Sequence, residues 1–280
     1  MAKKVNLTPT MGGMSSKMKI LFYGWPGSGK TRTSATACLV PELSPVLWLD
    51  ARGNPESIRN YPSQPHIIRV EQLEDFNDPF IWIYNGQPKD AKFAKDFGLA
   101  GAAPFKTLVI DQLTDVQLMM FSKKQNPQGT LPGNLANKRE WDDYNTVLYT
   151  MWNFAKEYYS LAERGLIHVI MTAQEISTEE GGAQRSARPY LEGKSSVMVA
   201  SYASIVGRLM SGDQLPTNVK KKLPGVEDPL EVESIAGFKR TQNFEAKDQY
   251  GGLPDVMINP TLSKMLDCFR AYEAKPGRRS

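Results

Sequence analysis

The segment GWPGSGKT, residues 24–31, constrains the fold of this chain more than any other part of its sequence. It follows the apolar run KILFYG (19–24) and precedes TRTSATACLV (31–40), whose pattern is helical, so we expect a strand, a glycine-rich turn and a helix in succession. Glycines in such a turn allow several backbone N–H groups to point at one anion, and the start of the helix adds partial positive charge. The segment therefore predicts a phosphate-binding loop.

The side chains of this loop suit a nucleoside triphosphate. Lys30 would reach the β and γ phosphates of ATP, and the Thr31 hydroxyl would ligate Mg²⁺. The residues expected to bind the nucleotide are Gly24, Pro26, Gly27, Ser28, Gly29, Lys30, Thr31 and Arg32.

Short apolar runs alternate with longer helical patterns along the rest of the chain. The runs are KILFYG (19–24), PVLWLD (45–50), HIIRV (66–70), TLVID (107–111), LIHVIMTA (166–173), SIVGRLM (204–210) and VESIAGF (232–238). Such alternation is typical of an α/β protein whose largely parallel sheet is covered by helices on both faces. We predict one core, residues 19–272, with a polar N-terminal tail (1–18) and a basic C-terminal tail (273–280).

The chain shows no membrane signal, because no stretch offers about 18 uninterrupted apolar residues and no apolar segment follows the N-terminal lysines. A cytoplasmic protein is therefore expected. The net charge of +4 permits binding to nucleic acid without arguing for it, so that question depends on local clusters.

Asp111 ends the apolar run TLVID, and open α/β sheets bind ligands at the carboxyl ends of their strands. It fits the Walker-B position, which would make Thr31 and Asp111 the magnesium pair. The alternative is an aspartate that caps the following helix.

The catalytic base is open between several polar residues at strand ends. Asp50 and Glu56 could each polarise a water, or could each be a turn or capping residue. Gln174, beside Glu175 after another run, could orient the γ-phosphate or be an exposed strand end.

Two irregular segments, 122–139 and 177–194, interrupt the alternation and carry basic residues with an aromatic. This composition suits the backbone and unstacked bases of single-stranded DNA, although such charges can also be merely solvated. The candidate DNA-binding residues are Lys123, Lys124, Lys138, Arg139, Arg185, Arg188, Tyr190 and Lys194.

From Lys19 to Leu266, the chain resembles the phage RecA-like P-loop ATPases, which include ATP-dependent single-strand annealing proteins. The resemblance depends on an ordered set of motifs: KILFYGWPGSGKT, VLWLDARGNPES, TLVIDQLT, EWDDYN, HVIMTAQE, PYLEGK, VGRLM, AKDQYGGLP and INPTLSKML. It implies a RecA-like fold, ATP hydrolysis coupled to DNA, and a ring or filament of identical subunits in the host cytoplasm. A single-strand-binding protein is a candidate partner, and the N-terminal tail a candidate for oligomerisation.

The resemblance also assigns roles to single residues. Gln174 matches the glutamine that couples the γ-phosphate to the following DNA-binding loop. Lys247 matches the first basic residue of a Lys-x-Arg finger that enters the ATP site of the neighbouring subunit. With Lys30, Asp50 and Asp111, these two complete the predicted catalytic set.

Two positions depart from the family pattern. Arg52 stands where relatives carry the catalytic glutamate, so hydrolysis would be slow, or Asp50 would serve instead. Gln249 stands where the finger would have its arginine, so the finger keeps one charge and loses bidentate recognition.

Three functions follow as hypotheses. The first is a DNA-dependent ATPase that anneals or pairs strands in phage recombination or replication. The second is an ATP-binding assembly or regulatory module that hydrolyses little, which Arg52 favours. The third is a small-molecule kinase, since the same loop also serves phosphoryl transfer.

Overall fold

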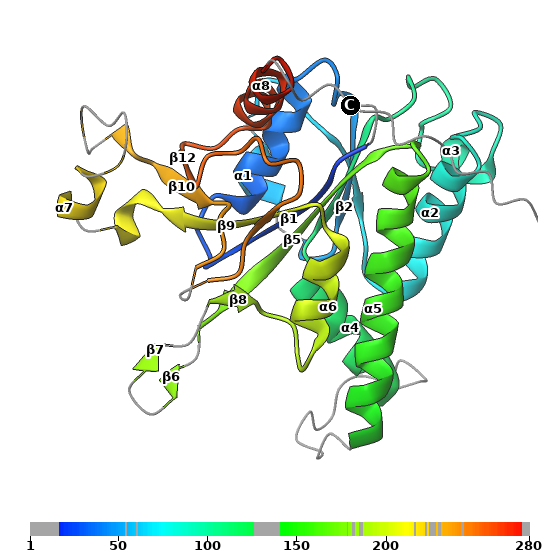
Figure 1. Ribbon diagram of the computed structural model, residues 1–280. Helices are drawn as coiled ribbons and strands as arrows, with labels where there is room; N and C mark the ends of the chain where they lie inside the picture. Colours follow the sequence, from blue (N-terminus) through cyan, green and yellow to red (C-terminus); the bar gives the residue numbers. More distant parts are fainter. Residues whose placement is uncertain are drawn as a thin grey trace, which may run out of the picture.

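A large sheet forms the centre of the molecule (Figure 1). The computed structural model describes residues 17–275, except 54, 60, 126–140, 178, 181–182, 185–186, 216, 222, 224–227, 229–230 and 242–243. The main strands are β1 (Lys19–Gly24), β2 (Val46–Asp50), β3 (His66–Arg69), β4 (Thr107–Asp111), β5 (His168–Ile176), β9 (Ile205–Ser211), β10 (Ser234–Gly237) and β12 (Val256–Ile258). Shorter strands are β6 (Glu179–Glu180), β7 (Ala183–Gln184), β8 (Arg188–Pro189) and β11 (Lys247–Asp248).

The strands lie in the order β12-β10-β9-β1-β5-β4-β2-β3. From β9 to β3 all neighbours are parallel, whereas β10 and β12 extend the sheet with antiparallel pairs. All seven predicted strands are present, and the largely parallel α/β sheet is confirmed.

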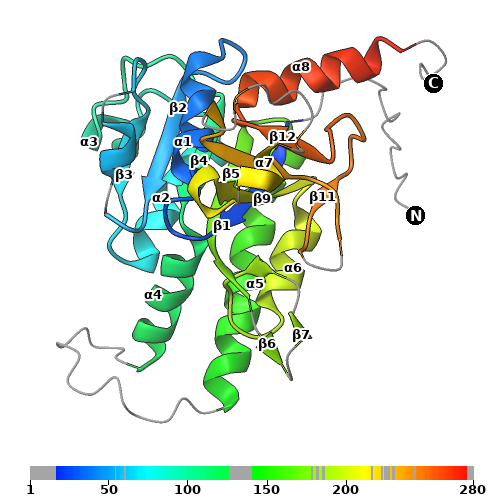
Figure 2. The ribbon, with the colours of Figure 1, turned by 90° about the vertical axis from the view of Figure 1, so that its left-hand side faces the viewer.

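Helices cover both faces of this sheet (Figures 1 and 2). They are α1 (Lys30–Ala35), α2 (Asn77–Tyr84), α3 (Lys92–Asp96), α4 (Leu113–Gln125), α5 (Trp141–Glu163), α6 (Ser195–Tyr202), α7 (Thr217–Lys220) and α8 (Leu262–Glu273). Side chains of α2 to α6 form one hydrophobic cluster, and those of α1 and α8 form another on the opposite face. Within the described residues, no helix is both long and apolar enough to cross a membrane.

The sequence of strand β1 is almost wholly apolar because the strand is buried on both faces. Leu21 and Tyr23 belong to the cluster under α2 to α6, whereas Ile20 and Phe22 belong to the cluster under α1 and α8. Successive side chains of a strand point to opposite faces, so a strand covered on both sides needs apolar residues throughout.

The two segments predicted to be irregular are partly regular. In the first segment, Ser122 to Gln125 form the last turn of α4. In the second segment β8 pairs with β5, and β6 pairs with β7.

Candidate nucleotide-binding site

The predicted phosphate loop connects β1 to α1. At two of its positions the backbone leaves no room for a side chain or has a positive φ, and both positions are glycine. A Cβ atom on Gly24 would lie 2.2 Å from the Leu209 carbonyl oxygen. Gly29, directly before α1, has φ of 91°, in the left-handed region that glycine adopts without strain. The loop therefore keeps its tight path only with these glycines.

A cavity of about 410 Å³ lies over this loop. Its walls come from the loop itself, from Arg52 and Ser57 after β2, from Asp111 and Gln112 at the tip of β4, and from Glu233 and Ser234 beside β10. Three cationic side chains line it: Lys30, Arg32 and Arg52. A cavity with backbone N–H groups and three cations suits a polyphosphate.

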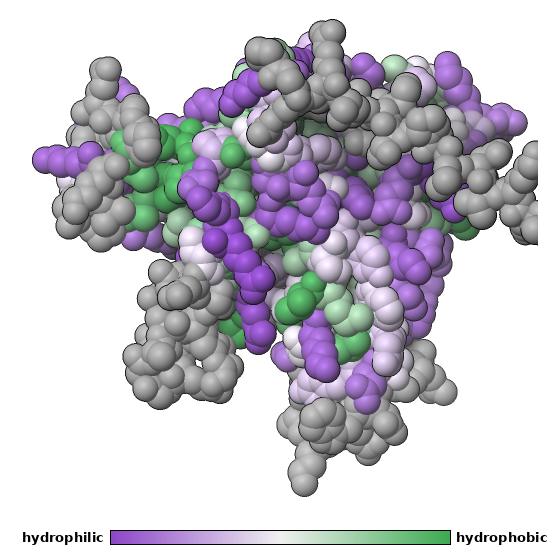
Figure 3. All heavy atoms as spheres, in the orientation of Figure 1, coloured by the Kyte–Doolittle hydropathy of each residue, from purple (hydrophilic) through white to green (hydrophobic). Residues whose placement is uncertain are grey.

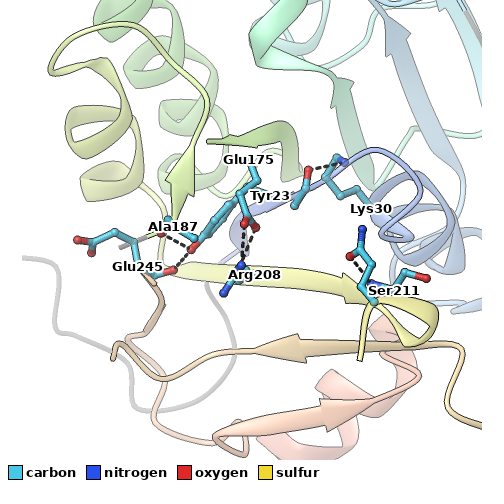
Figure 4. A network of polar contacts seen from close by, with 9 residues as sticks. Tyr23, Lys30, Glu175, Ala187, Arg208, Ser211 and Glu245 are labelled. Carbon is cyan, nitrogen blue, oxygen red and sulfur yellow. Dashed lines mark hydrogen bonds and ion pairs between the residues drawn. The ribbon is translucent and has the colours of Figure 1, made fainter. Parts of the chain in front are cut away.

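Lys30 is buried at the base of the cavity. Its Nζ donates hydrogen bonds to the carbonyl oxygens of Gly24 (2.9 Å) and Trp25 (3.0 Å), and Figure 4 shows it folded back onto the loop. Burial lowers its pKa from 10.5 to about 8, and repulsion from Arg52 acts in the same direction, while Asp111 opposes the shift. An anionic ligand would favour the charged form of this lysine.

The Asp111 carboxylate accepts hydrogen bonds from two side-chain hydroxyls. Thr31 Oγ1 donates to its Oδ2 at 2.9 Å, and Thr172 Oγ1 donates to its Oδ1. Burial raises the pKa of this carboxyl, against the effect of both hydrogen bonds and of Lys30. A carboxylate and a hydroxyl within hydrogen-bonding distance are hard oxygen donors of the kind that Mg²⁺ prefers, so this pair fits the metal.

Asp50 is the register partner of Asp111 on the neighbouring strand. Its Oδ1 accepts hydrogen bonds from the backbone N–H groups of Arg52 (3.1 Å) and Gly53 (2.9 Å), so it organises the turn after β2. That turn brings Arg52 to the cavity wall. Glu56 is exposed and faces Arg59, with 3.7 Å between the charged atoms, and it does not line the cavity.

Gln174 and Glu175 follow one another on β5, so their side chains leave opposite faces of the sheet. Gln174 is the register partner of Gly24, beside the phosphate loop. Glu175 is buried and forms a bidentate ion pair with Arg208 of β9, at 2.6 and 2.8 Å (Figure 4). Because the partner lies on a distant strand, sequence reasoning missed this pair.

The backbone of Gln174 is tied to the segment before α6. Its N–H donates to Thr114 Oγ1 at 3.0 Å, and its carbonyl accepts from the Tyr190 N–H at 2.7 Å. The Thr114 hydroxyl in turn donates to the Tyr190 carbonyl at 3.1 Å. These three residues, which we call the Gln174 relay, connect the strand beside the phosphate loop to a candidate DNA-binding residue.

The other candidate DNA-binding residues are scattered or undescribed. Arg188 and Lys194 lie in the same segment as Tyr190, whereas Lys123, on α4, forms an ion pair with Glu74. Lys138, Arg139 and Arg185 lie outside the described residues, as does the side chain of Lys124.

Lys247 lies apart from the phosphate loop of its own chain. Its Nζ donates to the carbonyl oxygens of Ser201 (2.9 Å) and Ala203 (2.7 Å), at the end of α6. It borders a second cavity of about 640 Å³ between α6 and the 188–189 and 245–247 segments. Val197 of α6 is exposed and lines this cavity, and Figure 3 shows apolar surface over α6.

Sheet order and loop together define the class of the protein. The strand with the phosphate loop (β1) is separated by one strand from the strand that ends in Asp111 (β4), and both tips meet at one cavity. This arrangement is that of a P-loop nucleotide-binding ATPase domain.

The comparisons with known proteins agree with this class. The family described as AAA domain matches residues 16–250, and the chain belongs to that family. A search of curated proteins gives no match. The match supports a P-loop ATPase, the broader part of the resemblance to phage RecA-like ATPases.

Sequence reasoning did not find Glu233, Ser234 or Thr172. The first two lie more than two hundred residues from the phosphate loop and reach it only through the pairing of β9 with β10. Thr172 carried a weak signal, because it precedes Gln174 by two residues and so shares its face of β5.

Proposed function

We propose that this protein is an ATPase stimulated by single-stranded DNA, which promotes annealing or strand pairing in phage recombination or replication. The observation that carries the proposal is the Gln174 relay. It would connect a change at the phosphate loop, beside which Gln174 lies, to Tyr190 through a short path of hydrogen bonds. Tyr190 is exposed and lies within four residues of Arg188 and Lys194 in the chain.

Different residues around the cavity would bind different parts of ATP and its Mg²⁺ ion. Lys30 would leave its two carbonyl partners for the β and γ phosphates, which are stronger acceptors. Thr31 and Asp111 would hold Mg²⁺, which neutralises phosphate charge when bound. Gln174, on the strand beside the loop, would orient the γ-phosphate end.

A test measures ATP turnover with and without single-stranded DNA, in the wild type and in Thr114→Val. Valine keeps the shape of threonine and removes the hydroxyl that bonds both Gln174 and Tyr190, leaving their direct backbone bond in place, so DNA stimulation should fall more than basal turnover. Thr150→Val is the matched control, since Thr150 is exposed on α5. If DNA does not stimulate the wild type, the DNA-dependent part of the proposal is wrong.

The contact with DNA has its own readout. Replacing Arg188 and Lys194 with alanine should weaken binding and reduce the slope of log affinity against log salt by about 0.7 for each lost phosphate contact. An unchanged slope would remove this segment from the DNA path.

Lys247 is proposed to act in trans, at the site of an adjacent subunit in a ring or filament. Lys247→Ala subunits keep an intact phosphate loop, and Lys30→Ala subunits keep an intact finger. If the finger acts in trans, mixing the two inactive variants should restore activity at some interfaces. Full activity of Lys247→Ala alone would end the assignment.

A second candidate is an ATP-binding assembly module with slow hydrolysis. It is favoured by Arg52 at the cavity wall, and by an Asp50 carboxylate that faces the backbone of its own turn. Tight ATP binding with little turnover, indifferent to DNA, would support this candidate over the first.

A further inference from the structure

The order of the strands indicates on which side of the cavity the nucleoside would bind. In the order β10-β9-β1-β5-β4, the phosphate loop follows the middle strand, Asp111 lies two strands away on one side, and Ser234 lies two strands away on the other. Thr31 and Asp111 mark the metal end, where β and γ phosphates bind. With the β and γ phosphates held there, the side of the cavity toward β10, where Arg32, Glu233 and Ser234 form the wall, is left for the α-phosphate and the nucleoside.

The backbone of Glu233 and Ser234 is held firmly at this wall. Asn259 Oδ1 accepts hydrogen bonds from both N–H groups, at 2.9 and 3.1 Å. The Gly212 N–H donates to the Glu233 carbonyl at 2.7 Å, and a Cβ on Gly212 would lie 1.8 Å from the Val232 carbonyl oxygen. This close packing fixes where the Glu233 side chain starts.

The carboxylate of Glu233 lies against the guanidinium of Arg32, with 2.5 Å between the charged atoms. Both side chains are more than half exposed, at 59% and 62%, so the pair contributes little to folding stability. It does hold a carboxylate at the end of the cavity opposite the metal pair. An ionised carboxylate is a hydrogen-bond acceptor, and the hydroxyls of a ribose are donors that it could bind.

We propose that Glu233 recognises the ribose of the bound nucleotide by accepting hydrogen bonds from its hydroxyls, while Arg32 orients the carboxylate and faces the α-phosphate. The inference depends on the proposed ATP site and adds selection of ribonucleotides over deoxynucleotides. The competing role for Glu233 is a simple counter-charge that tunes the affinity of Arg32 for phosphate.

These two roles differ in what they do to closely related ligands. Loss of a counter-charge would strengthen binding of ATP, its deoxy analogues and inorganic triphosphate alike. Loss of a ribose contact changes the ratio between ATP and its deoxy analogues, since a site built to bind a hydroxyl rejects the ligand that lacks it. A general electrostatic change alters the affinities for ATP and for its deoxy analogues equally, so it leaves their ratio unchanged.

Calorimetry in the presence of Mg²⁺ can measure affinities for ATP, 2′-deoxyATP, 3′-deoxyATP and inorganic triphosphate. The wild type should bind at least one deoxy analogue about tenfold more weakly than ATP, the size expected for one hydrogen bond to a charged group. In Glu233→Ala the ratio should fall close to one, with triphosphate bound at least as tightly as by the wild type. Glu231→Gln, an exposed charge two residues away, should keep the wild-type ratio.

Equal affinity of the wild type for ATP and both analogues would overturn the ribose contact and leave the ATP site standing. Discrimination that persists in Glu233→Ala would overturn it too. If neither ATP nor triphosphate binds the wild type, the proposed ATP site itself fails, and the ribose contact with it.

Discussion

Asp50 and Asp111 end two adjacent parallel strands and are register partners, yet their carboxylates do different things. Asp111 accepts hydrogen bonds from two side-chain hydroxyls of other elements, that of Thr31 on α1 and that of Thr172 on β5. Asp50 accepts two N–H groups of its own turn. The same residue type at the same edge is thus a candidate ligand in one strand and a turn organiser in the next.

The difference comes from what each strand tip faces. The tip of β4 lies beside β5 and the phosphate loop, so its carboxylate is buried and accepts hydrogen bonds from the hydroxyls of Thr31 and Thr172. The tip of β2 is followed by a turn whose N–H groups need acceptors. Asp50 remains a candidate for the catalytic base, and the variants below separate the two roles.

Asp111→Asn should produce the largest effect, a fall in Mg²⁺-dependent ATP turnover of about 10³-fold. Asparagine can keep the threonine contacts but removes the charge that would hold the metal, whose stabilisation of phosphate charge is worth several kcal/mol. Steady-state turnover at several Mg²⁺ concentrations measures this. Wild-type turnover in the variant would show that Asp111 is not the metal ligand.

Arg52→Glu should raise turnover, toward about 10²-fold, the low end of what a general base contributes. Arg52 lines the cavity and is close enough to lower the pKa of Lys30, so a carboxylate there would face the same space. Arg52→Gln is the control, because it removes the cation without adding a base. Equal rates in both variants would mean that only the loss of the cation matters.

The affinity for ATP should depend on pH through the protonation of Lys30. Its pKa is about 8 without ligand, and bound phosphates would raise it, so binding above pH 8 takes up a proton and affinity falls as pH rises, by at most about tenfold per unit. Calorimetry in buffers of different ionisation enthalpy counts the proton. Lys30→Arg should abolish the uptake, because arginine stays charged. Proton uptake that survives in Lys30→Arg would point to another group.

Asp50→Asn should have the smallest effect, less than about tenfold on turnover, well below the contribution of a general base. Its Oδ1 can still accept the N–H groups of Arg52 and Gly53, so the turn should survive. A fall of about 10²-fold or more, with unchanged thermal stability, would instead identify Asp50 as the base.

The sequence alone was enough to predict seven of the eight main strands, the parallel sheet and the phosphate loop. These features depend on local order: an apolar run, glycines at fixed spacing and a helical pattern that follows. Lys30, Thr31 and Asp111, which the sequence assigned to one site, line one cavity, since strand tips of a parallel sheet meet at one edge. The short strands β8 and β11 escaped prediction, because two-residue pairings carry no periodic pattern.

Only the tertiary structure decided which polar residues share the site. Glu233 reaches the cavity because β10 pairs with β9, and Arg208 meets Glu175 across the intervening strand β1. It also decided that the ammonium of Lys247 meets the end of α6. A linear pattern records which residue follows which, whereas long-range pairing sets the distance between side chains that are far apart in the chain, and hydrogen bonds form only where that distance is short.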